Sequence, residues 1–163
     1  MTPTAHYETS LACLPRHTAA AYLFLVRPMP LVSVTRLRLR KMRFLPGFVY
    51  YAVRSMMQSK KAEGNLHASA ERQARVVFWT ITVWEDERSM RHFRNSGPHR
   101  RVMPKLANWC DEATFVHWVQ DTSEPPSLSQ AHARLIAEGT VSRVSYPSPA
   151  HATRAFPPPP APA

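Results

Sequence analysis

The stretch RVVFWTITVW, residues 75–84, decides the fold. It is rich in β-branched and aromatic side chains, which are typical of a β-strand. Because successive side chains of a strand point to opposite faces, the stretch divides into two sides. One side is uniformly apolar and suits packing under helices: Val77, Trp79, Ile81 and Val83. The other side combines aromatic rings with hydroxyls and suits a buried face that accepts polar groups: Phe78, Thr80, Thr82 and Trp84.

The patterns on both sides of this strand predict a β-α-β-β-α-β order. Before it, alternation predicts a strand over 31–39, helical spacing predicts a helix over about 45–61, and a short strand follows over 66–71 with a turn at 72–73. After it, the sequence predicts helical pieces at 86–94 and 99–109 and a strand over 112–120. A helix over 128–138, closed by Gly139, and a short edge strand at 142–146 end the pattern.

This order predicts an α+β protein with the ferredoxin-like split βαβ arrangement, in which helices lie on one face of a four-stranded antiparallel sheet. The other face needs a cover. Polar side chains interrupt the neighbouring strands on the side of Thr80 and Thr82: Ser33, Thr35, His67, Ser69 and His117. An exposed patch with this many aromatic rings would be a liability. We therefore expect a homodimer in which two sheets meet face to face and enclose a cavity.

Composition excludes several classes of protein. The chain has 163 residues, enough for one domain, and a formal net charge of +10. No apolar run approaches the roughly 20 residues of a membrane-spanning helix, so no transmembrane segment is predicted. Two cysteines, Cys13 and Cys110, are too few for a disulfide framework, and we expect a reducing, cytoplasmic compartment.

Both ends of the chain differ from the patterned part. Residues 1–28 lack clear periodicity, and we expect an unstructured or spurious N-terminal extension, with Met29 as the true start. The domain is predicted to span residues 29–146. Residues 147–163 are rich in proline, which lacks an N–H, and we expect them to form a disordered tail.

Three stretches carry a resemblance to known proteins: VSVTRLRLRKMRFLPGFVYY, FWTITVWED and RNSGPHRRVMPKLANWCDEA. They resemble the dimeric α/β-barrel superfamily, and within it a group of small proteins of unassigned activity near the antibiotic biosynthesis monooxygenases. The spheroidene monooxygenases are similar in outline, although their chains are longer. The resemblance covers roughly residues 30–146.

The resemblance implies a ferredoxin-like domain that dimerises through its sheet. Some members are cofactor-free oxygenases of polycyclic aromatic substrates, others bind haem, and others only bind a ligand. We therefore expect a monooxygenase-like oxidoreductase that acts on a hydrophobic or aromatic small molecule in a cavity, with either no cofactor or haem. The alternative is a non-catalytic protein of the same fold that binds a small molecule or haem.

Three histidines are the candidate catalytic residues. His99 follows Gly97-Pro98 at the start of a helix, where it could act as a base or bind haem iron. Beside it, Arg100 and Arg101 could hold a carboxylate. His67 and His117 lie on predicted strands, on the side assigned to the cavity. The expected ligand-binding residues of that face are Phe78, Thr80, Thr82 and Trp84.

Each of these residues also has a purely structural interpretation. The histidines could be hydrogen-bonded core or loop residues, and the aromatic rings could be core. Cys110 beside Asp111 and Glu112 is predicted to be a buried structural thiol, and no ligand spacing predicts a metal site. The basic run of Arg36, Arg38, Arg40, Lys41 and Arg43 is interpreted as a solvated rim. No helix-turn-helix or RNA-binding motif accompanies it, so nucleic acid is not expected as a partner.

Overall fold

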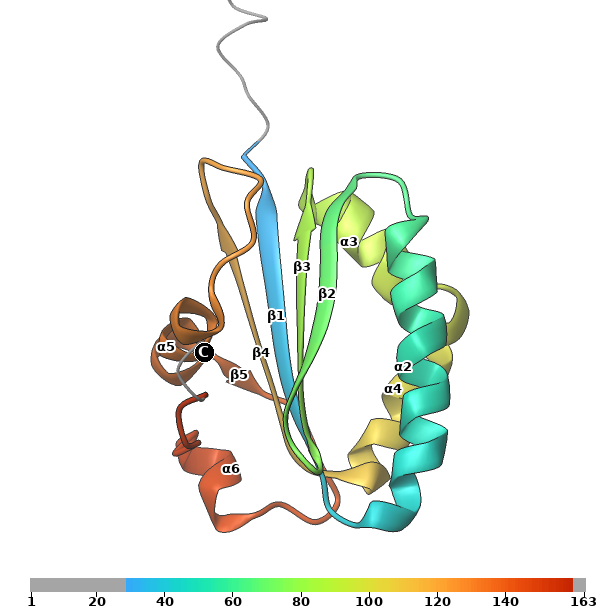
Figure 1. Cartoon of the computed structure of the whole chain (residues 1–163), viewed down its shortest axis with the longest axis vertical. Helices are drawn as coiled ribbons and strands as arrows, with labels where there is room; N and C mark the ends of the chain where they lie inside the picture. The colour runs from blue at the N-terminus through green and yellow to red at the C-terminus, as the bar shows by residue number, and fades with distance from the viewer. Residues whose placement is uncertain (1–28, 160–163) are drawn as a thin grey trace, which may run out of the picture.

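The computed structural model describes residues 29–159, which form one five-stranded antiparallel sheet with helices on both faces (Figure 1). The order of strands across the sheet is β2-β3-β1-β4-β5. The first four strands are in the ferredoxin-like order, so the predicted α+β fold class is confirmed. The strands are β1 (Leu31–Leu39), β2 (Asn65–Ala74), β3 (Val77–Trp84), β4 (Cys110–Val119) and β5 (Thr140–Val141).

Local sequence signals explain where the helices begin. The helical elements are η1 (Met42–Phe44), α2 (Leu45–Lys60), α3 (Glu87–Arg94), α4 (Gly97–Trp109), α5 (Leu128–Glu138) and α6 (Pro149–Thr153). Asp86 accepts a hydrogen bond from the Ser89 N–H and caps α3, while Ser127 and Gln130 form a reciprocal capping box at α5. None of the helices within residues 29–159 combines the length and the hydropathy needed to cross a membrane.

The two faces of the sheet pack against different helices. The side of β3 that carries Phe78 and Trp84 is called the α2 face here, because it packs against α2, α3 and α4. The Phe78 ring lies 4.7 Å from that of Phe48 on α2, and the Trp84 ring stacks on Phe93 of α3 at 5.1 Å. The opposite side of the sheet is called the α5 face.

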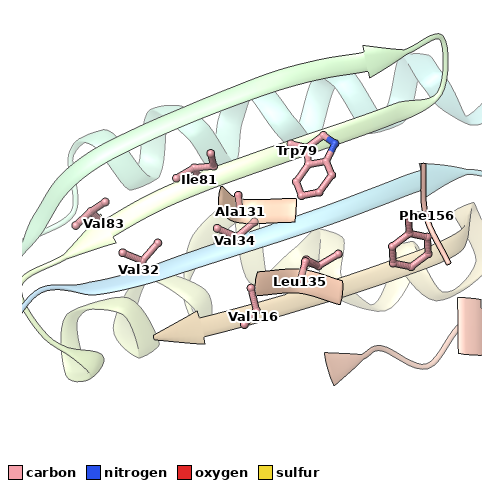
Figure 2. Packing of buried hydrophobic residues seen from close by; sticks show 9 residues of the cluster. All are labelled: Val32, Val34, Trp79, Ile81, Val83, Val116, Ala131, Leu135 and Phe156. Carbon is pink, nitrogen blue, oxygen red and sulfur yellow. The ribbon is translucent and has the colours of Figure 1, made fainter. Parts of the chain in front are cut away.

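The α5 face holds the main hydrophobic core. Ala131 and Leu135 of α5 and Phe156 near the C-terminus cover side chains from three strands (Figure 2). The strand residues of this cluster are Val32, Val34, Trp79, Ile81, Val83 and Val116. All nine side chains are at most 5% exposed, so this face is sealed by the chain itself.

This arrangement corrects the expected cover of the sheet. We expected helices on one face and a partner's sheet on the mixed aromatic and hydroxyl face. Instead the mixed face lies under α2–α4, and the apolar face lies under α5 and Phe156. The physical reason is that residues 128–156 supply enough apolar side chains to bury the second face. The sheet therefore does not need a second copy to cover it.

The proline-rich C-terminal segment also differs from the expected disordered tail. Residues 149–153 form α6, and His151 and Phe156 are buried. Proline is compatible with this helix because Pro149 stands in its first turn, where the missing N–H costs nothing. The N-terminal extension expected at residues 1–28 lies outside the described residues, as do residues 160–163.

The largest differences between the predicted and the observed strand boundaries are in β2 and β5. β2 runs to Ala74 rather than 71, because the turn falls at 75–76. There the Arg72 guanidinium donates to the carbonyl oxygens of Ala74 and Arg75 and closes the turn. The edge strand β5 lies at 140–141, slightly before the predicted 142–146.

Candidate functional site

The centre of the α2 face is a floor of small and polar side chains. Ser33 of β1 pairs with Thr82 of β3, and Thr35 pairs with Thr80, so four hydroxyls stand together. Next to the Ser33–Thr82 pair lie His117 on β4 and Ala68 on β2. Next to the Thr35–Thr80 pair lie Phe115 on β4 and Ala70 on β2. Larger side chains bound the floor: Phe78 and Leu37 at one end, Trp84 and Leu31 at the other.

Burial shows that helices α2–α4 do not seal this floor. Ser33, Thr35, Thr80 and Thr82 are only half-buried, although they lie on the two central strands. On the same strands, the side chains of the α5 face at Val32, Val34, Ile81 and Val83 are at most 3% exposed. Because these small side chains are only partly covered, solvent reaches the floor beneath the helices.

Helix α2 carries a buried hydroxyl on the side that faces the domain. The Ser55 Oγ atom is buried and has no hydrogen-bond partner among the described residues. Ser55 lies on the side of α2 that buries Phe48 and Ser59. A buried hydroxyl without a partner is unfavourable, so this atom is suited to bind a water molecule or a polar atom of a ligand.

His99 presents one free ring nitrogen. Its Nδ1 atom lies 3.1 Å from the Arg94 carbonyl oxygen, which can only accept a hydrogen bond. In the neutral ring Nδ1 therefore carries the proton, and Nε2 keeps a lone pair. Burial, together with the charge of Arg94, lowers the pKa of His99 and outweighs the hydrogen bond to the Arg94 carbonyl oxygen. His99 is thus a neutral base at pH 7.

Aromatic contacts connect His99 to the floor. The His99 ring lies 4.7 Å from Phe93, and Phe93 stacks on Trp84. The Trp84 indole N–H then donates to Thr82 Oγ1 at 2.9 Å. This series of contacts fixes the orientation of the aromatic wall beside the threonine hydroxyls.

Gln58 holds the α3–α4 turn in place, a role that no motif in the sequence indicates. Its amide Nε2 donates to the Phe93 and Ser96 carbonyl oxygens, at 3.1 Å each, and to Ser96 Oγ. Its Oε1 accepts the His99 backbone N–H at 3.1 Å. One side chain of α2 thereby fixes the segment that carries Phe93 and His99. Only the three-dimensional packing of α2 against this turn reveals the role.

His117 lies in the floor, on the same face of the sheet as Thr80 and Thr82. Burial lowers its pKa, the positive charge of Arg94 lowers it further, and Glu87 opposes this. Arg94 therefore acts on both His99 and His117, a link that the sequence did not indicate. The two histidines share a neighbour and are both disposed to be neutral.

The structure separates His67 from this group. His67 pairs with Val83, so its side chain lies on the α5 face, and Ser69 follows it opposite Ile81. The cause is a shift in register between Asn65 and His67. In regular pairing from Asn65 opposite Trp84, His67 would stand opposite Thr82. One additional residue in the strand moves each following side chain to the other face.

Arg100 and Arg101 also lie away from the floor. Both are exposed on the first turns of α4, whereas His99 is half-buried. The expected role of these arginines in holding a carboxylate beside His99 remains a prediction, since no contact within residues 29–159 ties either guanidinium to the floor.

The arginines of β1 are bound within the chain rather than forming a solvated rim. Arg36 is 2% exposed, pairs with Glu112 and lies 4.2 Å from the Phe156 ring. Arg38 donates to both carboxylate oxygens of Asp111 at 2.8 and 2.9 Å. These charges are compensated by acidic partners, so they do not form a phosphate-binding surface.

The residues around His99 do not fit a haem. The ring of Phe93 packs against His99, and Trp84 packs against Phe93, so this side of the imidazole has no room for a porphyrin. Within residues 29–159, no group of three His, Cys, Asp or Glu side chains gathers at distances that would hold a metal ion.

An open groove of about 800 Å³ lies elsewhere, between the end of β4, the loop at 120–126 and α5. Trp118 and Arg134 line it, and the guanidinium lies 5.4 Å from the indole ring. The groove contains neither His99 nor His117. We favour the floor of the α2 face, because His117 and four half-buried hydroxyls lie together there, whereas Asp121, Thr122 and Glu124 of the groove are exposed.

Comparison with solved structures identifies the fold. A conserved protein from Methanosarcina mazei Go1 aligns with a TM-score of 0.51 and 16% identity, over 58% of this chain and 95% of that one. A protein of unknown function from Nitrosomonas europaea aligns with a TM-score of 0.51 and 13% identity, over 63% and 99%. Identities this low show the shared fold alone. They confirm the predicted ferredoxin-like fold.

The family is more specific. The chain belongs to the DUF3291 family, described as a domain of unknown function, which matches residues 41–141. SnoaB, a cofactor-independent oxygenase from Streptomyces nogalater, aligns with a TM-score of 0.42 and 17% identity, over 58% of this chain and 94% of that one. The comparison with curated proteins found no match.

Proposed function

We propose that this protein is a cofactor-free, monooxygenase-like oxidoreductase that acts on a hydrophobic or aromatic small molecule bound on the α2 face. The observation that carries the proposal is the half-buried floor of Ser33, Thr35, Thr80 and Thr82, bounded by aromatic rings and His117. A flat ligand would pack against the half-buried Phe78 ring while the hydroxyls bind its oxygen atoms. Trp84 was the other expected stacking surface, but it is fully buried against Phe93 and only bounds the floor.

His99 is the proposed base. Its neutral ring, with Nδ1 bound to the Arg94 carbonyl oxygen, leaves Nε2 to accept a proton from an acidic C–H or O–H of the substrate. Removal of that proton gives an electron-rich anion that can transfer electrons to O2. For a substrate methylene, one methylene group and one O2 molecule give one ketone carbonyl and one water molecule. The methylene carbon is oxidised, one oxygen atom enters the product, and the other leaves as water with the two methylene hydrogens.

The alternative is a binding protein with the same floor and no chemistry. It is favoured by the close packing of the His99 ring against Phe93, which limits how near a substrate can approach. In that case Phe78, Thr80 and Thr82 would still bind an aromatic ligand, and His99 would serve only to fix the α3–α4 turn.

Turnover and binding distinguish the two functions. We would measure O2 consumption with anthrone, a tricyclic ketone with an acidic methylene, and binding of 1-naphthol by quenching of tryptophan fluorescence. The variant His99→Asn keeps a donor near the position of Nδ1 and removes Nε2. It should lower turnover at least about 100-fold, with 1-naphthol affinity unchanged. The exposed His92→Asn serves as the control.

Saturable 1-naphthol binding without O2 consumption by the wild type would support the binding protein instead. Full activity in His99→Asn would contradict the role of His99 as the base.

A homodimer in the cytoplasm also stays a proposal. The resemblance to dimeric proteins supports the dimer. The packing of the sheet does not, because helices of the same chain lie on both of its faces. Face-to-face docking of two sheets would require α5 and Phe156 to leave the α5 face. Sedimentation velocity of the full chain tests the dimer, and a monomer at micromolar concentration would contradict it.

A further inference from the structure

The outer side of α2 is unusually apolar for an exposed helix. Val49, Tyr50, Val53 and Met57 are 43–56% exposed. Because four residues are slightly more than one helical turn, these side chains share one side of α2. The opposite side of the helix buries Phe48 and Ser59 against the domain. A stripe of this length differs from scattered exposed apolar residues and indicates an interaction surface.

Cations flank this stripe on α2 and α4, and neither helix carries an acidic side chain. Residues 41–61 and 97–109 contain no Asp or Glu. They contain eight exposed cations: Lys41, Arg43, Arg54, Lys60, Lys61, Arg100, Arg101 and Lys105. None of the ion pairs formed by the described residues uses any of these eight side chains. The positive charge of this surface is therefore uncompensated.

Helices α2 and α4 form one continuous surface. They lie side by side on the same side of the sheet (Figure 1). The Lys105 Nζ atom of α4 lies 5.9 Å from the Tyr51 ring of α2, and Tyr51 lies 6.2 Å from Trp109. We call the exposed side chains of residues 41–61 and 100–105 the basic apolar surface.

We propose that the basic apolar surface docks this protein onto anionic lipid bilayers, with α2 lying in the plane of the headgroups. A helix with an apolar stripe and flanking lysines and arginines has the composition of an interfacial helix. The apolar side chains would enter the boundary of the acyl chains, and the cations would bind lipid phosphates.

A nucleic acid would contact the cations but leave Val53 and Met57 without a partner. The combination of both features favours the membrane. The proposal concerns the outside of α2, so it does not depend on the function proposed for the α2 face beneath it.

The test is flotation of the full chain with vesicles, which needs no ligand in the site. One set of vesicles is pure phosphatidylcholine, and the other contains 30% phosphatidylglycerol. We expect binding at 100 mM salt to the anionic vesicles and at least tenfold weaker binding to the neutral ones. Each basic residue near an anionic surface contributes about a fivefold change in affinity, so Arg54→Gln with Lys60→Gln should weaken binding about 25-fold.

The apolar stripe is tested by Val53→Ser with Met57→Ser, which leaves the charge unchanged and should weaken binding to anionic vesicles at least about tenfold. Val119→Ser is the matched control, because Val119 is also 53% exposed but lies outside the surface. Arg134→Gln on α5 is the control for charge. Circular dichroism melts identify any variant that has lost its fold, and the charge variant then carries the test.

Three results would overturn the proposal. The first is no binding of the wild type to anionic vesicles. The second is unchanged vesicle binding by the Val53 and Met57 variant, which would show nonspecific charge attraction only. The third is tighter binding of a fluorescent 20-nucleotide single-stranded DNA than of vesicles, if Arg54→Gln with Lys60→Gln also weakens the binding of that DNA. That result would assign the surface to nucleic acid.

Discussion

At the scale of single residues, His99 and His117 make the stability of the fold depend on pH. Burial lowers the pKa of both below the ordinary value of about 6.5, so the folded chain binds fewer protons than the unfolded chain as the pH falls. Stability from these groups is complete above about pH 6.5 and is lost as the pH falls through their lowered pKa values.

We therefore expect the free energy of unfolding in urea to decrease between pH 7.5 and pH 5.5. His99→Asn should make this decrease smaller, because the variant has no imidazole to protonate. His92→Asn, at an exposed position, should leave the slope as in the wild type. Equal slopes for the wild type and His99→Asn would show that His99 is not a buried neutral imidazole.

Cys110 gives a second prediction at this scale. Burial, and to a lesser extent the nearby Asp111, raises the pKa of its thiol to about 12. The thiolate is the reactive form, so the folded protein should hardly react at pH 8. In the Cys13→Ser chain, we expect reaction with a disulfide reagent to be at least about 100-fold slower without denaturant than in guanidinium chloride. Stoichiometric labelling of the native protein within minutes would contradict this.

The sequence identified some of the site residues and misplaced others. Alternation along β3 correctly grouped Phe78, Thr80, Thr82 and Trp84 on one face, because a regular strand keeps its period. It failed for His67, because a register shift in β2 has no clear signal in a run of small residues. Gln58 was missed, since its contacts join segments 35–41 residues apart.

At the scale of elements, the C-terminal segment acts as part of the core. Phe156 is 5% exposed and contacts both the apolar cluster of the α5 face and the Arg36 guanidinium. The sequence predicted α5 correctly from its amphipathic spacing and Gly139. It did not predict that α6 and Phe156 return to the sheet, because composition rich in proline resembles that of disordered segments.

This packing predicts the cost of truncating Phe156. Phe156→Ala should lower the free energy of unfolding by about 3–4 kcal/mol, the usual cost of removing a buried phenylalanine. Pro157→Ala, at an exposed neighbouring position, should change it by less than about 0.5 kcal/mol. Chemical denaturation of the full chain measures both. A negligible effect of Phe156→Ala would mean that the segment does not pack on the α5 face.

At the scale of the whole molecule, one chain covers both faces of its sheet in different ways. The α5 face is sealed by apolar packing, whereas the α2 face keeps a polar, half-buried floor under its helices. The order of strands and helices followed from the sequence because each element has a clear period. The location of the site did not, because alternation alone cannot determine which cover lies over which face.

The most direct test of this account is to map a bound aromatic probe by NMR. In ¹H–¹⁵N and methyl spectra of the full chain titrated with 1-naphthol, the perturbed signals should belong to Ser33, Thr80, Thr82 and His117, together with the Trp84 indole N–H. This result would place the ligand between the sheet and helices α2–α4. Perturbations confined to Trp118 and its neighbours in the groove beside α5 would contradict the central claim.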